Sequence, residues 1–170
     1  MNKPIRCAVI GQNPMRFPWG FDEEDKFCSK MKLELAQQIM VLHQCGVSQF
    51  LTACDCGVGL YAAEIVNGLR ETADQDLMLF CYTPHEEQAT KWAPYLRERY
   101  FTMLEKCTLI SVVCPVGTPD AQLQAGSHFA CKIKKPQAQV PTAARSKIYF
   151  RKSYTIHDRK LTAIPFFTIH

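Results

Sequence analysis

The sequence predicts an α/β protein with a Rossmann-like, doubly wound and mostly parallel sheet that has helices on both faces. Two observations predict this class. Four short, β-rich apolar runs recur along the chain without regular polar alternation, as in strands that are covered on both faces. Between these runs, apolar residues recur at intervals of three and four, as in amphipathic helices. Strands that alternate with helices are typical of a parallel sheet.

The predicted strands lie within residues 5–11, 46–54, 76–82 and 108–114. Each predicted helix shows one apolar stripe. The stripes are Cys28, Met31, Leu35, Ile39 and Leu42, with Gly46 as the stop; Val58, Ala62, Ile65 and Leu69; and Trp92, Leu96, Tyr100 and Met103.

Threonine–proline pairs predict where two helices begin. Thr83 is placed as an N-cap, Pro84 as the first helical residue and Glu86 as the acid that returns the hydrogen bond. A second pair, at Thr118, repeats this pattern. Pro94 interrupts the third stripe, so we expect a short helix before it and a longer one starting near it.

The C-terminal part of the chain is basic. Residues 132–170 hold nine Lys/Arg and one acid, a net charge of +8, whereas residues 1–131 have a net charge of −4. Residues 134–146 read as a loop, and residues 147–150 and 161–170 as strands, with Pro165 confining the second to an edge or an irregular position. The charge is compatible with a nucleic-acid or phosphate-bearing partner and also with a solvated basic surface.

Composition indicates one cytoplasmic domain, residues 1–170. The apolar run near the N-terminus is too short for a signal peptide, and no run is long enough to span a bilayer, so we expect no membrane partner. The nine cysteines are odd in number and scattered, which favours buried, reduced thiols over a disulfide scaffold.

The cysteines also predict no metal site. Cys54 and Cys56 with His43 and Cys45 are residue types that bind zinc, but the chain has no Cys-x-x-Cys pair to support such a site. We expect no metal and no cofactor. Cys56 is near a predicted helix N-terminus, which can activate a thiol, but burial is the favoured interpretation.

The stretch "TACDCGVGLYAAE", Thr52 to Glu64, joins a predicted strand to a predicted helix. Amides at a helix N-terminus favour an anion, and Gly57 and Gly59 allow close approach of a ligand. The stretch matches neither the GxGxxG fingerprint nor a Walker loop. It is therefore a tight turn that is also a candidate phosphate cradle.

Two other turns carry candidate residues. His85, Glu86 and Glu87 offer acid–base groups after the third strand, although acids also stabilise a first helical turn. After the first strand, Arg16 and a group of aromatic residues offer a phosphate contact and a stacking surface. The alternative is an aromatic lid packed on the first helix; the aromatic residues are Phe17, Trp19 and Phe21.

The order of several motifs resembles the YpsA-like branch of the SLOG superfamily, which also contains the DprA and LOG proteins. The motifs are "GQNP", "FPWGFDEED", "FLTACDCGVGLYAAEIV", "PHEEQATKW", "RERYFTMLEKC" and "TPD", within residues 5–120. The resemblance implies a Rossmann-like domain that binds a nucleotide-type ligand at the glycine turn. LOG relatives are phosphoribohydrolases, and DprA relatives bind single-stranded DNA.

The chain departs from the family pattern at polar positions. Gln12 and Asn13 replace a His-Arg pair, Ala53 replaces a glycine, and Gly59 stands where the family has an aspartate. The family's Asn-Arg pair, Ser-Asp pair, late glycine-rich turn and LOG catalytic motif are missing. These losses remove an arginine for phosphate and an acid for ribose hydroxyls.

Three functions follow from these features. The first is non-catalytic binding of a nucleotide or nucleotide-derived phosphate ligand through Gln12, Arg16, Thr52, Gly57, Val58 and Gly59. The second is hydrolysis of a nucleotide N-glycosidic bond, with Glu64 or Glu87 as the only plausible carboxylates. The third is an interaction module that uses the basic segment. A homo-oligomer is compatible with all three.

Overall fold

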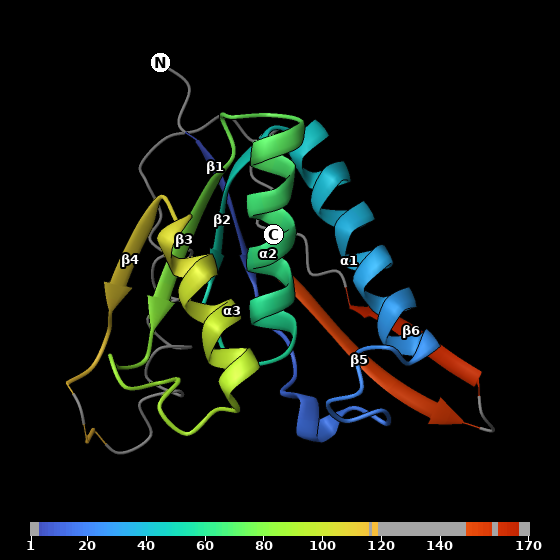
Figure 1. Ribbon diagram of the computed structural model, residues 1–170. Helices are drawn as coiled ribbons and strands as arrows, with labels where there is room; N and C mark the ends of the chain where they lie inside the picture. The colour runs from blue at the N-terminus through green and yellow to red at the C-terminus, as the bar shows by residue number, and fades with distance from the viewer. Residues whose placement is uncertain (1–3, 116, 119–148, 158–159, 167–170) are drawn as a thin grey trace.

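The first strand of the chain lies inside the sheet and has further strands on both sides. The computed structural model describes residues 4–115, 117–118, 149–157 and 160–166. Six strands lie in the order β4-β3-β2-β1-β5-β6 (Figure 1). They are β1 (Ile5–Val9), β2 (Val47–Thr52), β3 (Met78–Thr83), β4 (Leu109–Val112), β5 (Tyr149–His157) and β6 (Lys160–Phe166). The Rossmann-like α/β class is confirmed.

Strands β1 to β4 are all parallel, and the chain moves one place outward at each step. It then returns to the other side of β1, where β5 pairs in parallel through Ala8–Tyr149 and Val9–Phe150. The direction of winding therefore reverses between β1 and β5. Strand β6 pairs antiparallel with β5, and Pro165 lies on this edge strand as predicted.

Three helices connect the parallel strands and lie in one layer over the same face of the sheet (Figure 1). They are α1 (Lys26–Gln44), α2 (Val58–Thr72) and α3 (Pro94–Glu105). All five residues of the first predicted stripe are buried in α1. Helices on the second face remain a prediction. No helix among the described residues combines the length and apolarity needed to cross a bilayer.

The predicted helix start at Thr83 is wrong. Residues 86–91 form turns, and the helix begins only at Pro94, with Ala93 as its N-cap. The reason is that the carbonyl groups of Thr83 and Pro84 accept hydrogen bonds from Val113 and Cys114, at 2.9 Å each. These bonds prolong the strand pairing, so the same carbonyls are not available to a first helical turn. The second pair, at Thr118, leads into residues outside the described ranges.

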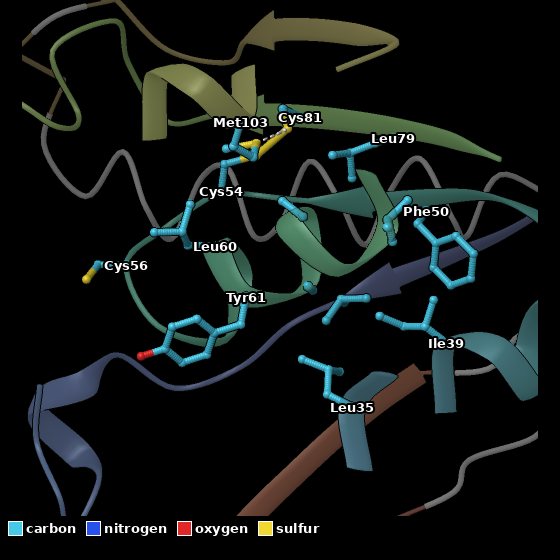
Figure 2. Packing of buried hydrophobic residues seen from close by; sticks show 14 of the residues in the cluster. Leu35, Ile39, Phe50, Cys54, Cys56, Leu60, Tyr61, Leu79, Cys81 and Met103 are labelled. Atoms are coloured by element: carbon cyan, nitrogen blue, oxygen red, sulfur yellow. Dashed lines mark hydrogen bonds between the residues drawn. A yellow bond between two sulfur atoms is a disulfide. The ribbon is translucent and has the colours of Figure 1, made fainter. Parts of the chain in front are cut away.

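The main core lies between the sheet and the three helices. Alternate strand residues such as Cys7, Phe50 and Leu79 point into it, and each is about 1% exposed (Figure 2). They meet the stripe of α1, including Leu35 and Ile39. Burial of such side chains stabilises the fold by about 1.5–3 kcal/mol each.

One pair of cysteines contradicts the expectation of reduced thiols. Cys54 and Cys81 form a disulfide, with Cα atoms 6.0 Å apart (Figure 2). Parallel pairing places Thr52 beside Cys81, so the turn after β2 brings Cys54 within bonding distance. The two residues are 27 positions apart in the sequence. Sequence spacing alone gives no sign of this neighbourhood, which the strand register creates.

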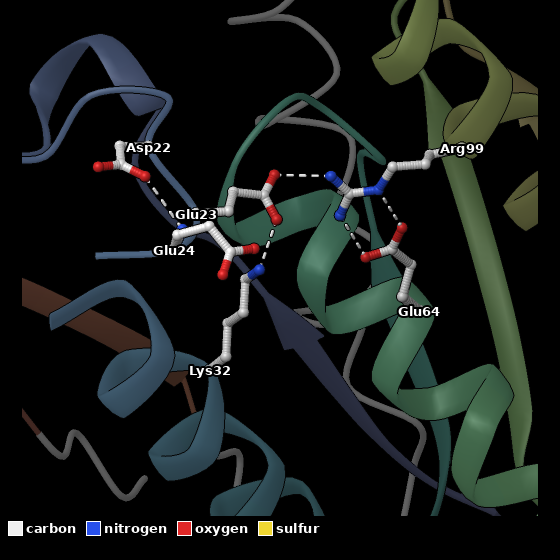
Figure 3. A network of polar contacts seen from close by, with 6 residues as sticks. All are labelled: Asp22, Glu23, Glu24, Lys32, Glu64 and Arg99. Carbon is white, nitrogen blue, oxygen red and sulfur yellow. Dashed lines mark hydrogen bonds and ion pairs between the residues drawn. The ribbon is translucent and has the colours of Figure 1, made fainter. Parts of the chain in front are cut away.

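A group of ion pairs links all three helices on their outer side (Figure 3). The Arg99 guanidinium of α3 donates two hydrogen bonds to Glu64 of α2, at 2.8 and 2.7 Å, and one to Glu23 at 2.6 Å. Lys32 of α1 also binds Glu23. Burial would raise the pKa of Glu23, but the bonds from Arg99 and Lys32 outweigh it and lower that pKa. We call these four residues the helix clamp.

We expect Arg99→Ala to lower the free energy of unfolding by about 1–2 kcal/mol, because it leaves two carboxylates of the helix clamp without their shared partner. Arg97→Ala, on an exposed position of the same helix, is the matched control and should change stability by less than about 0.5 kcal/mol. Urea unfolding followed by circular dichroism measures both. Equal effects of the two substitutions would show that the clamp does not hold the helices together.

Candidate functional site

Three turns meet at the carboxyl ends of β1, β2 and β3. The turn after β1 contacts the start of α2, where the Val58 amide donates to the Gln12 carbonyl at 3.4 Å. The turn after β3 reaches the same region, because Gln88 Nε2 donates to the carbonyls of Cys54 (3.0 Å) and Ala53 (3.4 Å). Ligands of doubly wound sheets bind at this edge, where the strand order reverses.

Glycines let the backbone segments come this close. A Cβ atom at Gly11 would lie 2.2 Å from the Val58 Cβ, and one at Gly57 would lie 2.5 Å from the Gln12 carbonyl oxygen. Gly57 also has a φ of 101°, a conformation that side chains rarely adopt. The tight turn predicted for this stretch is therefore present and is packed against the loop after β1.

Two of the first three amides of α2, those of Val58 and Leu60, already have acceptors within the protein. Besides the Val58 amide, the Leu60 amide donates to the Asp55 carbonyl at 2.9 Å. Thr52 is 1% exposed, and its hydroxyl donates to the Gly59 carbonyl (3.2 Å) and accepts from the Cys54 amide (3.1 Å). Thr52 thus fixes the turn from inside.

The carboxyl group of Asp55 covers the N-terminal turn of α2. Its Oδ1 atom lies 2.1 Å from the position that a Cβ at Gly59 would occupy, so only glycine fits beneath it. Burial raises the pKa of Asp55 to about 6, while a hydrogen bond from its own backbone amide acts in the opposite direction. A carboxyl group with a raised pKa at the ligand-binding edge of a sheet is a candidate functional group.

Two buried polar atoms lie on the turn after β3. Gln88 Oε1 and His85 Nδ1 have no hydrogen-bond partner among the described residues. The Gln88 amide nitrogen is used by the Ala53 and Cys54 carbonyls, so its oxygen is left as an acceptor. Buried polar atoms normally have partners, which makes these two candidates for ligand contacts.

The remaining candidate residues are spread around the three turns. Arg16 is exposed at the end of a short 3-10 turn, η1 (Pro14–Arg16). Glu87 is exposed on the turn after β3. Glu64 lies in the helix clamp, where Arg99 binds both of its carboxylate oxygens. The structure therefore brings Gln12, Val58 and Gly59 together, whereas both carboxylate oxygens of Glu64 are already bound by Arg99.

The aromatic loop packs for the most part against the protein. Phe17 is 6% exposed and stacks on Trp19, with ring centroids 4.9 Å apart. Both belong to the packing around the main core. Phe21, by contrast, is 45% exposed. Of the three aromatic residues, Phe21 alone keeps an exposed ring that could stack on a ligand.

The cysteine and histidine residues weighed for zinc do not gather in one place. His43 lies at the end of α1 and contacts Val47 at the start of β2, with Nε2 2.7 Å from an Asp74 carboxylate oxygen. Cys54 and Cys56 lie beyond the opposite end of β2. No metal-binding cluster of three ligands occurs within the described part of the chain. Burial raises the pKa of Cys56 to about 11, as expected for a packed thiol.

Comparison with known proteins decides the family. Residues 7–132 match the YpsA family model, described as the YspA SLOG family. This chain belongs to the YpsA family. It is also 31% identical over 93 residues to a UPF0398 protein of Halalkalibacterium halodurans, covering 55% of this chain. The chain spans about half the length of that curated relative, since the match covers 49% of it.

The glycine turn carries an acid, Asp55, that was not among the candidate residues predicted from the sequence. The family resemblance led us to interpret Gly59 as the loss of an expected carboxylate. In the structure the Asp55 carboxyl group lies directly over Gly59. The signal missed in the sequence is the pair itself: an acid four residues before a glycine, on either side of a helix start.

We expect Gly59→Ala to lower the free energy of unfolding by about 1–3 kcal/mol, because the new methyl group would overlap the Asp55 carboxylate. The same change in an Asp55→Ala background should cost much less, since the overlapping atoms are gone. A double-mutant cycle by urea unfolding measures this coupling. Additive effects would contradict the placement of Asp55 over Gly59.

The raised pKa of Asp55 predicts a pH dependence of stability. The folded state holds this proton more tightly than the unfolded state, so stability is greatest below about pH 4 for this group and falls as pH rises to about 6. In the wild type, this group should lower the free energy of unfolding by about 1–3 kcal/mol between these pH values, and Asp55→Asn should not show that loss. Urea unfolding across this pH range tests the prediction for the wild type, for Asp55→Asn and for the exposed control Asp76→Asn. Parallel curves of unfolding free energy against pH for all three proteins would refute it.

Proposed function

We propose that this chain binds a nucleotide-type ligand, without catalysing its reaction, at the carboxyl edge of the sheet beside β1. The observation that carries the proposal is the Asp55 carboxyl group, which lies half-buried over Gly59 in the turn that follows β2. Membership of the YpsA family supports the class of ligand, since a nucleotide-type ligand at the glycine turn is what the resemblance implies.

The contacts at the turn favour a sugar over a phosphate at the start of α2. Val58 and Leu60 already donate their amides to protein carbonyls, and an ionised Asp55 would repel a phosphate group there. A carboxylate accepts hydrogen bonds from ribose hydroxyls, as in dinucleotide-binding sheets. We therefore assign the ribose to Asp55, within the turn that Thr52, Gly57, Val58 and Gly59 shape.

The phosphate and the base are assigned to the neighbouring turns. Arg16, exposed at the end of η1, is the cation of the turn after β1 and can pair with a phosphate. On the other side, Gln88 Oε1 is a buried acceptor that an N–H group of a base would satisfy. The Gln12 carbonyl accepts a hydrogen bond from the Val58 amide, which holds Gln12 against the start of α2.

Titration calorimetry with adenosine monophosphate, ADP-ribose and a 2′,3′-dideoxy nucleotide tests this assignment. We expect ribose nucleotides to bind at least about tenfold more tightly than the dideoxy compound. A tenfold difference in affinity corresponds to about 1.4 kcal/mol, which is the effect expected when one hydrogen-bonding partner is lost. Asp55→Asn should abolish this preference, and Arg16→Ala should weaken every nucleotide while leaving the preference intact.

Asp76→Asn and Arg97→Ala are the matched controls, because both residues are exposed and lie outside the three turns. They should bind as wild type does. The proposal fails if no nucleotide binds to the wild-type protein. It also fails if Asp55→Asn keeps the preference for ribose.

A further inference from the structure

A third sulfur atom lies beside the disulfide. Cys107 Sγ is 2.9 Å from Cys81 Sγ, on the side of the disulfide formed by α3 and the segment that follows it. Met103 of α3 lines the same contact, with its sulfur 3.7 Å from Cys81 Sγ and 3.5 Å from Cys107 Sγ. Figure 2 shows the bonded pair and Met103 at the end of the core.

The three cysteines differ in their access to solvent. Cys54 and Cys81 are each 0% exposed, so a dissolved thiol cannot reach either sulfur while the protein is folded. Cys107 is only partly buried, at the junction between α3 and β4. Of these three cysteines, Cys107 is therefore the one that a dissolved thiol can reach.

We propose that Cys54, Cys81 and Cys107 form a thiol–disulfide relay, in which Cys107 passes electrons from a dissolved thiol of the glutathione type to the buried disulfide. The proposal is independent of nucleotide binding, because it rests only on the sulfur contacts and their burial.

The relay runs in two balanced stages. In the first, Cys107 loses its proton and its sulfur attacks Cys81 Sγ; a Cys81–Cys107 bond forms, the Cys54–Cys81 bond breaks, and Cys54 leaves as a thiolate that takes up a proton. In the second, a dissolved thiol attacks Cys107 and releases Cys81, and another thiol then frees Cys107. Two dissolved thiols are oxidised to one disulfide, and Cys54 and Cys81 become thiols.

Burial raises the pKa of the Cys107 thiol to about 12, although the nearby Arg70 charge opposes this shift. The reactive thiolate is therefore scarce at neutral pH, which slows the exchange. Reduction of the disulfide would release Cys54 from its covalent link to β3. Cys54 directly precedes Asp55 and has a φ of 55°.

Reduction of the native protein by glutathione, followed by acid quenching, alkylation and peptide mass spectrometry, tests the relay. We expect Cys107→Ser to slow the loss of the Cys54–Cys81 linkage at least tenfold, while Cys45→Ser, which removes an exposed thiol, reacts as wild type does. In denaturant all three proteins should react at the same rate. An unchanged rate for native Cys107→Ser would overturn the proposal.

A second variant keeps the test independent of how Cys107→Ser folds. In Cys54→Ser, mild oxidation should produce a peptide pair that joins Cys81 to Cys107, because these sulfurs are already in contact. Recovery of that pair supports the relay. Its absence, with both residues recovered as alkylated thiols, would show that the contact does not permit bond formation.

Discussion

The close approach of the loop after β1 to the start of α2 is the constraint on which the rest of the site depends. Without side chains at Gly11 and Gly57, the Gln12 carbonyl comes close enough to accept the Val58 amide. The N-terminal turn of α2 is thereby joined to the central strand of the sheet. Because the sheet extends in both directions from that strand, this contact lies where the strand order reverses and where such folds bind ligands.

The same contact changes what the helix start can bind. A free helix N-terminus attracts phosphate through its unpaired amides. Here the Val58 and Leu60 amides have protein acceptors, and Asp55 supplies a carboxyl group above them. The turn is therefore better suited to donors such as sugar hydroxyls than to an anion. The disulfide from Cys54 to Cys81 fixes the residue before Asp55, so the acid is held by covalent as well as by packing contacts.

Much of the fold could be predicted, and the reasons for the failures are physical. The buried stripe of α1 and the parallel strands follow from the periodicity of apolar residues, which burial determines directly. The longer helix predicted to start near Pro94 is α3, but the helix start predicted at Thr83 is absent, because long-range bonds from Val113 and Cys114 outweigh a local capping signal. Asp55 and the Cys54–Cys81 pair were missed for a related reason. Each depends on which residues the strand register and the turn bring together, and spacing along the chain does not show this.

The proposed ligand site requires that the Asp55 carboxyl group is half-buried at the start of α2 and accepts the hydroxyl groups of a nucleotide-type ligand. Carboxyl-carbon NMR of Asp55 as a function of pH, with and without a saturating ribose nucleotide, tests it most directly. We expect a titration midpoint near pH 6 for Asp55 in the free protein and a lower midpoint with the nucleotide, because hydroxyl donors stabilise the ionised form. A midpoint near the ordinary aspartate value of about 4 in the free protein, or one that the nucleotide does not move, would contradict it.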